Sequence, residues 1–412
     1  MSVEVSIIMN SYNKYPQNLY SLQSLKHQTF DPSKMEVIFV DDASTDRTPK
    51  LRGLRTPYPF HYIRTERNVG RSEVKNIGIR AARGKIIIVM DAEMLVHPKL
   101  VEMHHRYHTR EDRLVVTGCL RHHGLFSVLQ PAFNHGQFAR FYSLIRKRPS
   151  LRRKFRLKSA KARLNVAKIS ARVRKTKKPM RLLTEWGIKR RTYRKYAFPD
   201  PLRGEVIRRF GQRYEGYHFP WYCVVTHCIS VRKSLFDEVG PFYEGFEGWG
   251  FEDWEFGYRL HQAGAKFLDD ARAPIYHQEH PVKPYSSIRM DNLKNYQRFL
   301  NRHRDFAVGV HTMLLLGLRD FVSVNGIMTD FKALSADDPE IGQTMQSACL
   351  VLFDSVAQRL VDQSRIENLS ETLQQHDAKM FRIFSSKLEA WRNGGQYPQF
   401  TAGMDELLAY RG

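Results

Sequence analysis

The first hundred residues of this chain predict an α/β fold built on a doubly wound sheet of parallel strands. Apolar runs of strand length alternate with segments of helical spacing from residue 3 to residue 93. This alternation is typical of parallel sheets that carry helices on both faces. The runs also end in polar or acidic side chains, and ligands bind such sheets at the carboxyl ends of the strands.

The individual elements follow from their apolar patterns. Residues 3–12 (VEVSIIMNSY) form a predicted buried strand that ends in a polar turn, and leucines at positions 19, 22 and 25 follow at helical spacing. The sequence then predicts two strands, a helix that stops at Gly84 and another buried strand: MEVIFVDDAS (35–44), FHYIRTE (60–66), SEVKNIGIRAARG (72–84) and KIIIVMDAE (85–93). Beyond about residue 290 the spacing is helical, without a motif that indicates a function.

Three loops follow the predicted strands and should converge at one edge of the sheet: residues 10–13, 41–44 and 91–93. The first strand is not followed by GxGxxG, and there is no Walker A motif, so a dinucleotide-binding Rossmann fold and a P-loop are both disfavoured. Few basic residues line these loops. A pyrophosphate bound there would therefore need a divalent cation, which acids at strand ends can hold.

Composition limits the class of protein. The chain has 412 residues, 42% of them apolar, and four cysteines, which are too few for a disulfide framework and suit a reducing cytoplasm. Two cysteines flank His227 in CVVTHC (223–228), but the spacing matches no strong zinc pattern and CVVTHCISV alternates like a strand. The first residues lack the basic region of a signal peptide, and no apolar run approaches the roughly 20 residues of a membrane span. We expect a cytoplasmic protein that is soluble or held at the inner membrane face.

Positive charge is concentrated in one segment. The chain carries a net charge of +24, and residues 146–213 hold 26 lysines and arginines against three acids, which gives this segment +23. Apolar residues recur there at three- and four-residue steps, which predicts cationic amphipathic helices: Phe155, Ala162, Val166, Ile169 and Val173. So dense a charge would repel itself without a polyanion nearby.

Four interpretations of this basic insert are open. It could be a solvated, partly disordered loop, or it could bind the anionic inner membrane leaflet, an anionic glycan or nucleic acid. Nucleic acid is disfavoured because the insert has no zinc finger and no obvious RNA-binding motif. Its aromatic residues are also few: Phe155, Trp186, Tyr193, Tyr196 and Phe198.

The stretch GWGFEDWEFGYRL (248–260) places three acids among two tryptophans and three glycines. Adjacent carboxylates such as Glu252 and Asp253 repel each other and lose hydration when half-buried, so a cation, a substrate or a proton-transfer role is expected. The acids could equally lie at a helix N-terminus, where negative charge is favourable. The two roles do not exclude each other.

Five motifs, in order and at matching spacing, resemble those of the family-2 glycosyltransferases of the GT-A fold: VSIIMNSYN, VIFVDDASTD, NVGRSEVKNIGI, VMDAEM and GWGFEDWEFGYRL. The stretch from Trp249 through YHQEH also resembles the C-terminal half of bacterial chondroitin- and hyaluronan-type polymerase domains and the animal galactosyltransferases. The resemblance covers residues 3–110 and 220–285. It implies a GT-A nucleotide-diphospho-sugar transferase fold with a basic helical insert and a C-terminal helical region.

On this basis we expect four parts. Residues 1–142 would be the nucleotide-sugar-binding part of the GT-A domain, and residues 143–215 the basic helical insert. Residues 216–290 would be the acceptor and catalytic part of the GT-A domain, and residues 291–412 a C-terminal helical region.

The resemblance also implies roles at the nucleotide. Asn10 and Tyr12 match positions that contact the base and the ribose, and Asp42 matches an acid that accepts a hydrogen bond from uracil. Arg71 lies in the loop that faces the base and the phosphates. Asp91 matches the first acid of the family's Asp-x-Asp, which approaches the ribose and a metal-bound water.

For the metal, the resemblance implies Mn²⁺ or Mg²⁺ between the two phosphates, held by Asp91, Glu93 and His277. His280 is a weaker candidate, since a histidine in a loop beside proline is often only exposed. Two departures from the family pattern matter. Asp-x-Asp is Asp-Ala-Glu here, and the longer glutamate moves its carboxylate. Lys75 stands where arginine is usual, which keeps the charge and loses the bidentate fork.

For catalysis, Asp253 matches the general base that deprotonates the acceptor hydroxyl, and Glu252 matches its neighbour that holds the acceptor or the sugar. Trp249 and Trp254 could stack on sugar faces and exclude water. One base acting on one face implies direct displacement with inversion at the anomeric carbon.

The sequence therefore predicts a metal-dependent inverting glycosyltransferase that uses a UDP-type nucleotide sugar and a glycan, lipid-linked or other acceptor. The competing prediction is a catalytically weak protein of the same fold that binds a polyanion or membrane surface through its insert. Each motif also has a purely structural explanation: Asp41, Asp42 and Ser44 could cap the next segment, Asp91 and Glu93 could form a solvated turn, and Trp249 could belong to the core.

Overall fold

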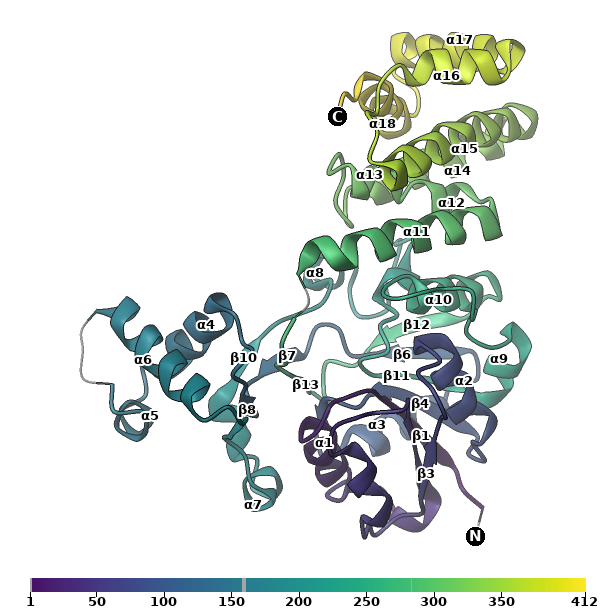
Figure 1. The fold of residues 1–412 in the computed structure, drawn as a ribbon. Coiled ribbons are helices and arrows are strands. Elements are labelled where there is room, and N and C mark those ends of the chain that lie inside the picture. The colour runs from purple at the N-terminus through teal and green to yellow at the C-terminus, as the bar shows by residue number, and fades with distance from the viewer. Residues whose placement is uncertain (1, 158–160, 283) are drawn as a thin grey trace. The chain divides into compact units, whose positions relative to one another are not determined.

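The structure is a computed structural model that describes residues 2–157, 161–282 and 284–412 (Figure 1). The chain divides into two compact units. The first comprises Met1–Gly204, Cys223–Phe242 and Phe256–Pro284, and the second comprises Glu205–Tyr222, Tyr243–Glu255 and Tyr285–Gly412.

A seven-stranded sheet forms the centre of the first unit, in the order β12-β6-β11-β4-β1-β2-β3 (Figure 1). Four neighbouring strands run parallel, as the sequence predicts: β1 (Val5–Ser11), β2 (Met35–Asp41), β3 (Phe60–Arg64) and β4 (Ile86–Asp91). The sheet continues with β11 (Ile229–Arg232), which is antiparallel to β4 and to β6 (Leu114–Thr117), while β12 (Lys266–Asp269) is parallel to β6. The predicted doubly wound α/β fold is confirmed, and one antiparallel strand interrupts its parallel order.

The central strands are largely apolar because helices cover both faces of such a sheet. Every residue of β2 and β4 is buried. The helices of this layer are α1 (Gln17–Leu25), α2 (Arg71–Arg80), α3 (Leu100–His108) and α9 (Lys233–Val239). Helix α2 lies close to the sheet at Gly78, where a Cβ atom would approach Ile8 Cγ2 to 2.4 Å, so only glycine permits this packing.

A second, four-stranded sheet brings distant segments together in the order β10-β7-β13-β5. Its strands are β5 (Met94–Val96), β7 (His122–Leu125), β10 (Ala197–Pro199) and β13 (Ile275–Gln278). Strand β5 follows β4 after two residues, so this sheet begins at the carboxyl end of the central strand. The pairing of β13 with β7 and β5 places His277 opposite Gly124 and Met94.

The basic insert packs in a core cluster that it shares with Tyr20, Leu95 and Tyr276 of the first unit. It contains α5 (Pro149–Lys154), α6 (Ala162–Lys175), β9 (Met180–Arg181) and α7 (Glu185–Lys189), with the preceding α4 (His135–Ile145), β8 (Val128–Leu129) and the following 3₁₀ helix η3 (Thr192–Tyr196) packed nearby. The predicted amphipathic helix is confirmed as α6. Its apolar residues Val166, Ile169 and Val173 are buried in a cluster with Phe155, whereas Ala162 is exposed. The insert is therefore a folded element, and the apolar side of α6 faces the protein.

The strand predicted for CVVTHCISV is shorter than expected. Residues Pro220–Cys223 form a 3₁₀ helix, and β11 begins only at Ile229. The alternation of apolar residues from 223 to 228 arises in an irregular segment that is largely buried, so it did not require a strand. This correction matters because His227 lies in that segment.

The second unit is helical, as predicted for the end of the chain. Its helices beyond the sheet region are α11 (Tyr285–His303), α12 (Phe306–Gly309), α13 (Thr312–Leu315), α14 (Val324–Asp337), α15 (Pro339–Asp362), α16 (Leu369–His376), α17 (Ala378–Gly394) and α18 (Pro398–Ala409). Helices α8 (Gly204–Phe210) and α10 (Glu252–Gln262) lie at the unit boundaries. Within the described residues, no helix combines the length and the hydropathy that crossing a bilayer requires.

Candidate active site

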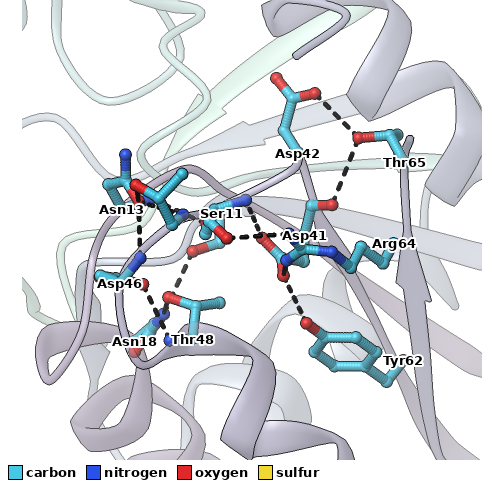
Figure 2. Close-up of polar contacts among 12 residues, drawn as sticks. Ser11, Asn13, Asn18, Asp41, Asp42, Asp46, Thr48, Tyr62, Arg64 and Thr65 are labelled. Carbon is cyan, nitrogen blue, oxygen red and sulfur yellow. Dashed lines mark hydrogen bonds and ion pairs between the residues drawn. The ribbon is translucent and has the colours of Figure 1, made fainter. Parts of the chain in front are cut away.

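Asp41 ends β2 and fixes the loop that follows it. Its carboxylate contacts the side chains of Tyr62 and Arg64 on β3, and it accepts a hydrogen bond of 2.9 Å from the backbone N–H of Ser44 (Figure 2). The Asp41 carboxylate is thus bound by groups of the protein itself, and the side chain is fully buried. Asp41 is therefore a structural acid of the strand end.

Asp42 points the other way, toward the segment that leads into α2 (Figure 2). Its carboxylate accepts hydrogen bonds from the backbone N–H groups of Val69 (2.7 Å) and Gly70 (3.3 Å) and from the hydroxyl of Thr65 (3.2 Å). Burial raises the pKa of Asp42 and outweighs these hydrogen bonds, which lower it. Asp42 thus holds residues 65–70, the segment immediately before the exposed Arg71.

The end of β1 lies between these loops. Asn10 is paired in register with Asp91 of β4, and its Oδ1 atom is buried and accepts no hydrogen bond from the part of the chain that the structure describes. Tyr12 is 47% exposed. Asn13 has a left-handed backbone (φ 54°), and its Oδ1 accepts hydrogen bonds from the backbone of residues 45 and 46, so the first two loops are tied together (Figure 2).

Glu93 lies just beyond β4 among three basic side chains. Lys14 Nζ lies 2.5 Å and His280 Nε2 lies 3.4 Å from Glu93 Oε1. One ligand atom from each of Glu93, His277 and His280 can be chosen so that all three lie within 4.8 Å of one another. Burial raises the pKa of Glu93, but Lys14, His280 and His277 outweigh it and hold the pKa well below its usual range. Glu93 is therefore a carboxylate, the form that binds a cation.

Four histidines from three segments form one group, in which His277 and His280 lie beside Glu93, and His122 and His227 lie beside His277. His122 begins β7, His227 precedes β11, His277 is on β13 and His280 follows it. His122 Nε2 lies 3.1 Å from His227 Nδ1, and the rings of His227 and His277 stack with centroids 4.8 Å apart. The pKa of His277 is lowered well below its usual range, and that of His122 is lowered to about 4. In both cases burial is the largest cause and the electrostatic effect of His227 is the second.

Asp91 lies on the His227 side of this group. His227 Nε2 is 3.8 Å from Asp91 Oδ2. Neutral imidazole and carboxylate groups are the usual ligands of divalent transition metals. The donor set at the end of β4 therefore fits a divalent cation.

The motif GWGFEDWEFGYRL lies at the start of α10 and is joined to α11. Its glycines allow close approach: a Cβ atom on Gly248 would lie 2.2 Å from Asp291 Oδ2, and Gly248 and Gly250 both have positive φ. Asn295 of α11 donates to the carbonyls of Glu247 (2.8 Å) and Gly250 (3.0 Å). The turn before the acids is thus held by hydrogen bonds within the second unit.

The three acids of this motif have different surroundings. Glu255 is fully buried and accepts hydrogen bonds from Arg302 Nε (3.2 Å) and His303 Nε2 (3.0 Å), so it is a structural acid. Glu252 is also buried, while Asp253 is half-buried in the first turn of α10. Negative charge there is favoured by the helix dipole.

The two tryptophans of the motif also differ. Trp249 is 44% exposed. Trp254 packs edge-on against Tyr222, Phe251 and His311, so its ring is part of an aromatic cluster of the second unit. Trp249 is therefore the more accessible of the two.

Two family models match this chain: Glycosyl transferase family 2 over residues 6–170, and N-terminal domain of galactosyltransferase over residues 209–281. The chain is also 32% identical over 286 residues to the uncharacterized glycosyltransferase YfnE of Bacillus subtilis (strain 168), which covers 68% of this chain and 66% of YfnE. The chain belongs to the family-2 glycosyltransferases.

More distant relatives of this glycosyltransferase include the chondroitin synthase of Escherichia coli, with 24% identity over 292 residues, 69% of this chain and 36% of that protein. Among solved structures, S. aureus TarS 1-349 in complex with UDP aligns at 13% identity over 95% of this chain and 92% of that one, with a TM-score of 0.45. The matched stretch spans about two thirds of YfnE and about a third of chondroitin synthase.

The structure of this glycosyltransferase brings some of the predicted site residues together and shows further residues beside them. Glu93 and His277 lie in one cluster, His280 joins them, and Asp91 lies beside His227. Sequence reasoning gave no role to His122 and treated His227 as part of a strand. The only signal for His227 was its position between two cysteines, both of which are free and buried.

Lys75 is the clearest departure of this glycosyltransferase from its family pattern. Its side chain is fully buried, and Nζ lies 4.9 Å from the centroid of the Phe242 ring. The adjacent Asn76 exchanges hydrogen bonds of 2.8 Å and 2.9 Å with the backbone of Phe242. In this chain, Lys75 and Asn76 hold the segment after α9 against α2.

Proposed function

We propose that this family-2 glycosyltransferase is metal-dependent and inverting, and that it transfers a sugar from a UDP-type nucleotide sugar to a hydroxyl of a glycan or lipid-linked acceptor. The observation that carries the proposal is the cluster of Glu93, His277 and His280 at the carboxyl end of β4. Ligands of doubly wound sheets bind at this edge. The cluster lies in the same unit as the strand-end loops of β1 and β2.

The residues at this edge fit a divalent cation, Mn²⁺ or Mg²⁺. Glu93, His277 and His280 would hold it, with Asp91 next to them. When bound, such a cation neutralises the charge that develops on the leaving diphosphate. Asp-Ala-Glu is compatible with this role because the longer Glu93 side chain reaches both histidines.

For the nucleotide, we propose Asn10, Tyr12, Asp42 and Arg71 as contacts with the base, ribose and phosphates, with Asp91 toward the ribose. The buried Oδ1 atom of Asn10 supports this, because a buried acceptor without a partner in the described chain is costly unless a ligand supplies a donor. The exposed rings and charges of Tyr12 and Arg71 are accessible to a ligand. Asp42 would contribute chiefly by holding residues 65–70 in place.

For the chemical step, we propose that Asp253 is the general base that takes the proton of the acceptor hydroxyl. Glu252, Trp249 and Trp254 would hold the acceptor or the transferred sugar. Part of the Asp253 side chain is accessible in the first turn of α10, whereas Glu255 is fully buried and paired with Arg302 and His303. A single base on one face gives inversion at the anomeric carbon.

We also propose that the basic insert binds a second, anionic partner, the cytoplasmic face of the membrane. No aspartate or glutamate occurs from residue 114 to residue 184. Two hollows, of about 270 Å³ and about 400 Å³, share Arg156 and are lined by further cations: Arg152, Arg153, Lys168 and Arg172. None of these five side chains forms an ion pair with a carboxylate among the described residues, and about 1 kcal/mol per basic residue favours an anionic membrane surface.

This surface binding differs from the insertion that an amphipathic helix would make, because the apolar side of α6 is buried in the protein. The same surface is the basis of the competing function, a catalytically weak protein that acts as a polyanion-binding module. The two proposals differ in whether a nucleotide sugar is turned over.

The deciding experiment is a panel of nucleotide sugars scored for thermal stabilisation and for release of the nucleotide, with Mn²⁺ and with EDTA. Metal-dependent stabilisation by one UDP-sugar is the expected result, and Glu93→Gln should abolish it. Arg106→Gln, a change of an exposed residue on α3, is the control and should respond like the unmodified protein. No response to any nucleotide sugar would contradict the transferase proposal and favour the binding module.

A further inference from the structure

His122 and His227 form a hydrogen-bonded pair next to the predicted metal ligands, and neither has a role in the proposed function so far. We propose that His227 is a further ligand of the metal ion, on the side of Asp91, and that His122 is a positioning residue that fixes the tautomer of the His227 ring. This inference rests on the metal-dependent function proposed above.

The first step concerns the proton on His122. Its Nδ1 atom lies 2.8 Å from the backbone carbonyl oxygen of Asp200. A carbonyl oxygen only accepts hydrogen bonds, so His122 Nδ1 carries the hydrogen and donates it. In the neutral ring, Nε2 is then an acceptor. The His122 side chain is only 2% exposed, so this arrangement is enclosed by the protein.

The second step derives the tautomer of His227 from that of His122. His227 Nδ1 lies 3.1 Å from His122 Nε2. Because His122 Nε2 accepts, His227 Nδ1 must donate, and the lone pair of a neutral His227 ring is then on Nε2. Metal-binding histidines commonly donate their other N–H group in this way, which fixes the ring and raises its basicity.

The third step concerns the surroundings of the lone pair on His227 Nε2. His227 Nε2 lies 3.8 Å from Asp91 Oδ2, and the His227 ring stacks on His277 at an interplanar angle of 25°. The His227 side chain is 25% exposed, whereas His122 is buried. His227 and Asp91 would thus add one nitrogen and one oxygen to the donors offered by Glu93, His277 and His280.

This donor set has a consequence for metal selectivity. Three imidazoles and two carboxylates favour borderline transition metals, because imidazole suits zinc, copper, iron and nickel while Mg²⁺ prefers oxygen ligands. We therefore expect the protein to bind Co²⁺ and Mn²⁺ more tightly than Mg²⁺, and we expect His227 to account for part of that preference.

The test uses Co²⁺ alone as the probe, with the whole 412-residue chain and no nucleotide. Calorimetry gives the affinity, and the visible absorption of bound Co²⁺ reports the number and kind of its ligands. His227→Phe keeps a ring for packing and removes both nitrogens. We expect it to weaken Co²⁺ binding about 10- to 100-fold, to weaken Mg²⁺ binding less, and to change the Co²⁺ spectrum.

His122 is tested by a matched pair. His122→Phe keeps the ring and removes the acceptor, and we expect about tenfold weaker Co²⁺ binding. His122→Gln supplies an amide oxygen that can accept from His227 Nδ1, and we expect it to restore most of the affinity. A purely structural role would make both variants alike. The thermal midpoint of each metal-free variant checks that the protein is folded.

The outcomes separate this inference from the proposed function. If Glu93→Gln abolishes Co²⁺ binding while His227→Phe leaves affinity and spectrum unchanged, His227 is not a ligand and the proposed metal-dependent function stands. If the unmodified protein binds no divalent cation, both fail. If His122→Phe and His122→Gln bind Co²⁺ equally well, the positioning role of His122 is wrong.

Discussion

The ammonium group of Lys14 lies 2.5 Å from a carboxylate oxygen of Glu93, so a cation from the protein already neutralises the acid that is expected to hold the metal. Lys14 comes from the loop after β1, and Glu93 from the end of β4. A divalent cation would have to compete with Lys14 for the same oxygen atoms.

Replacing Lys14 should therefore strengthen metal binding in the absence of nucleotide. Lys14→Met removes the competing charge, and we expect Mn²⁺ affinity to rise about tenfold, which corresponds to ~1.4 kcal/mol. Lys14→Arg keeps the charge and serves as the control. Calorimetric titration with Mn²⁺ measures the difference, and an unchanged or weaker affinity for Lys14→Met would show that the ion pair does not oppose the metal.

Removing the proposed base should abolish catalysis and spare donor binding. We expect Asp253→Asn to lower the rate of sugar transfer about 10²- to 10⁴-fold, the usual contribution of a general base. The affinity for the nucleotide sugar, measured by calorimetry, should stay within a factor of about two, because Asp253 takes no part in the strand-end loops. A variant that transfers sugar at the normal rate would exclude Asp253 as the base.

Glu255, two residues further on, should matter for stability. Glu255→Gln leaves Arg302 and His303 without their buried counter-charge. Loss of a buried pair costs 3–5 kcal/mol, and since Arg302 is 42% exposed we expect a smaller decrease of about 2 kcal/mol in the free energy of unfolding. Denaturant unfolding measures it. If Asp253→Asn lowered the free energy of unfolding as much as Glu255→Gln, this separation of roles would be contradicted.

Two buried histidines should destabilise the protein in acid. His104 Nδ1 and His108 Nε2 lie 2.8 Å and 2.7 Å from the hydroxyl of Ser230, and burial lowers the pKa of His104 to about 4 and that of His108 to about 3. The unfolded chain takes up these protons near pH 6.5, while the folded protein resists them until about pH 4. The free energy of unfolding should therefore fall as the pH drops from about 6.5 to about 4.

The measurement compares unfolding of the unmodified protein and of His108→Gln across this range. Each lowered pKa contributes up to ~2–3 kcal/mol, so the variant should lose about 2 kcal/mol less than the unmodified protein between pH 7 and pH 4.5. Asp269, whose pKa burial raises to about 6, acts in the opposite direction and is present in both proteins. Parallel pH profiles for the two proteins would show that His108 does not contribute.

The basic insert should bind anionic membranes through its exposed cations. Changing Arg152, Arg153 and Arg156 to glutamine removes three charges that line the two hollows. At about 1 kcal/mol each, we expect binding to phosphatidylserine-containing vesicles to weaken about 100-fold. Nucleotide release should be unaffected. The control changes three exposed basic residues of another segment, Lys50, Arg52 and Arg55, and should bind vesicles normally. Equal binding by both variants would contradict the proposal.

Local patterns were sufficient for much of the fold. The apolar runs of β1, β2 and β4 predicted buried parallel strands, because strands that are covered on both faces are largely apolar. Helical spacing predicted α2 and α6, although α2 ends at Arg80 instead of the predicted Gly84 and α6 begins at Ala162, after Phe155. The alternation in CVVTHCISV predicted a longer strand than the structure has. Alternate residues are also buried in an irregular segment, so this pattern does not determine the backbone conformation.

The candidate site was predictable only in part. Glu93 and His277 were identified because they match family positions, and the structure places them in one cluster with His280. Lys14 and His122 have no local pattern that marks them, and His227 has only its position between two cysteines. Lys14 reaches the cluster from the loop after β1, His122 through the pairing of β7 with β13, and His227 from the buried segment before β11.

The sequence by itself determined the succession of strands and helices over the first 93 residues, the acids at the strand ends, the family and the concentration of +23 charges in one insert. Tertiary structure alone decided that the apolar side of α6 is internal and that Glu255 is paired with Arg302 and His303. It also decided that His227 lies beside Asp91 and that His122 is hydrogen-bonded to His227. The physical reason is that periodicity reports which residues are buried within one element. Which side chains meet across elements depends on strand register and packing, and these are set by contacts between segments far apart in the chain.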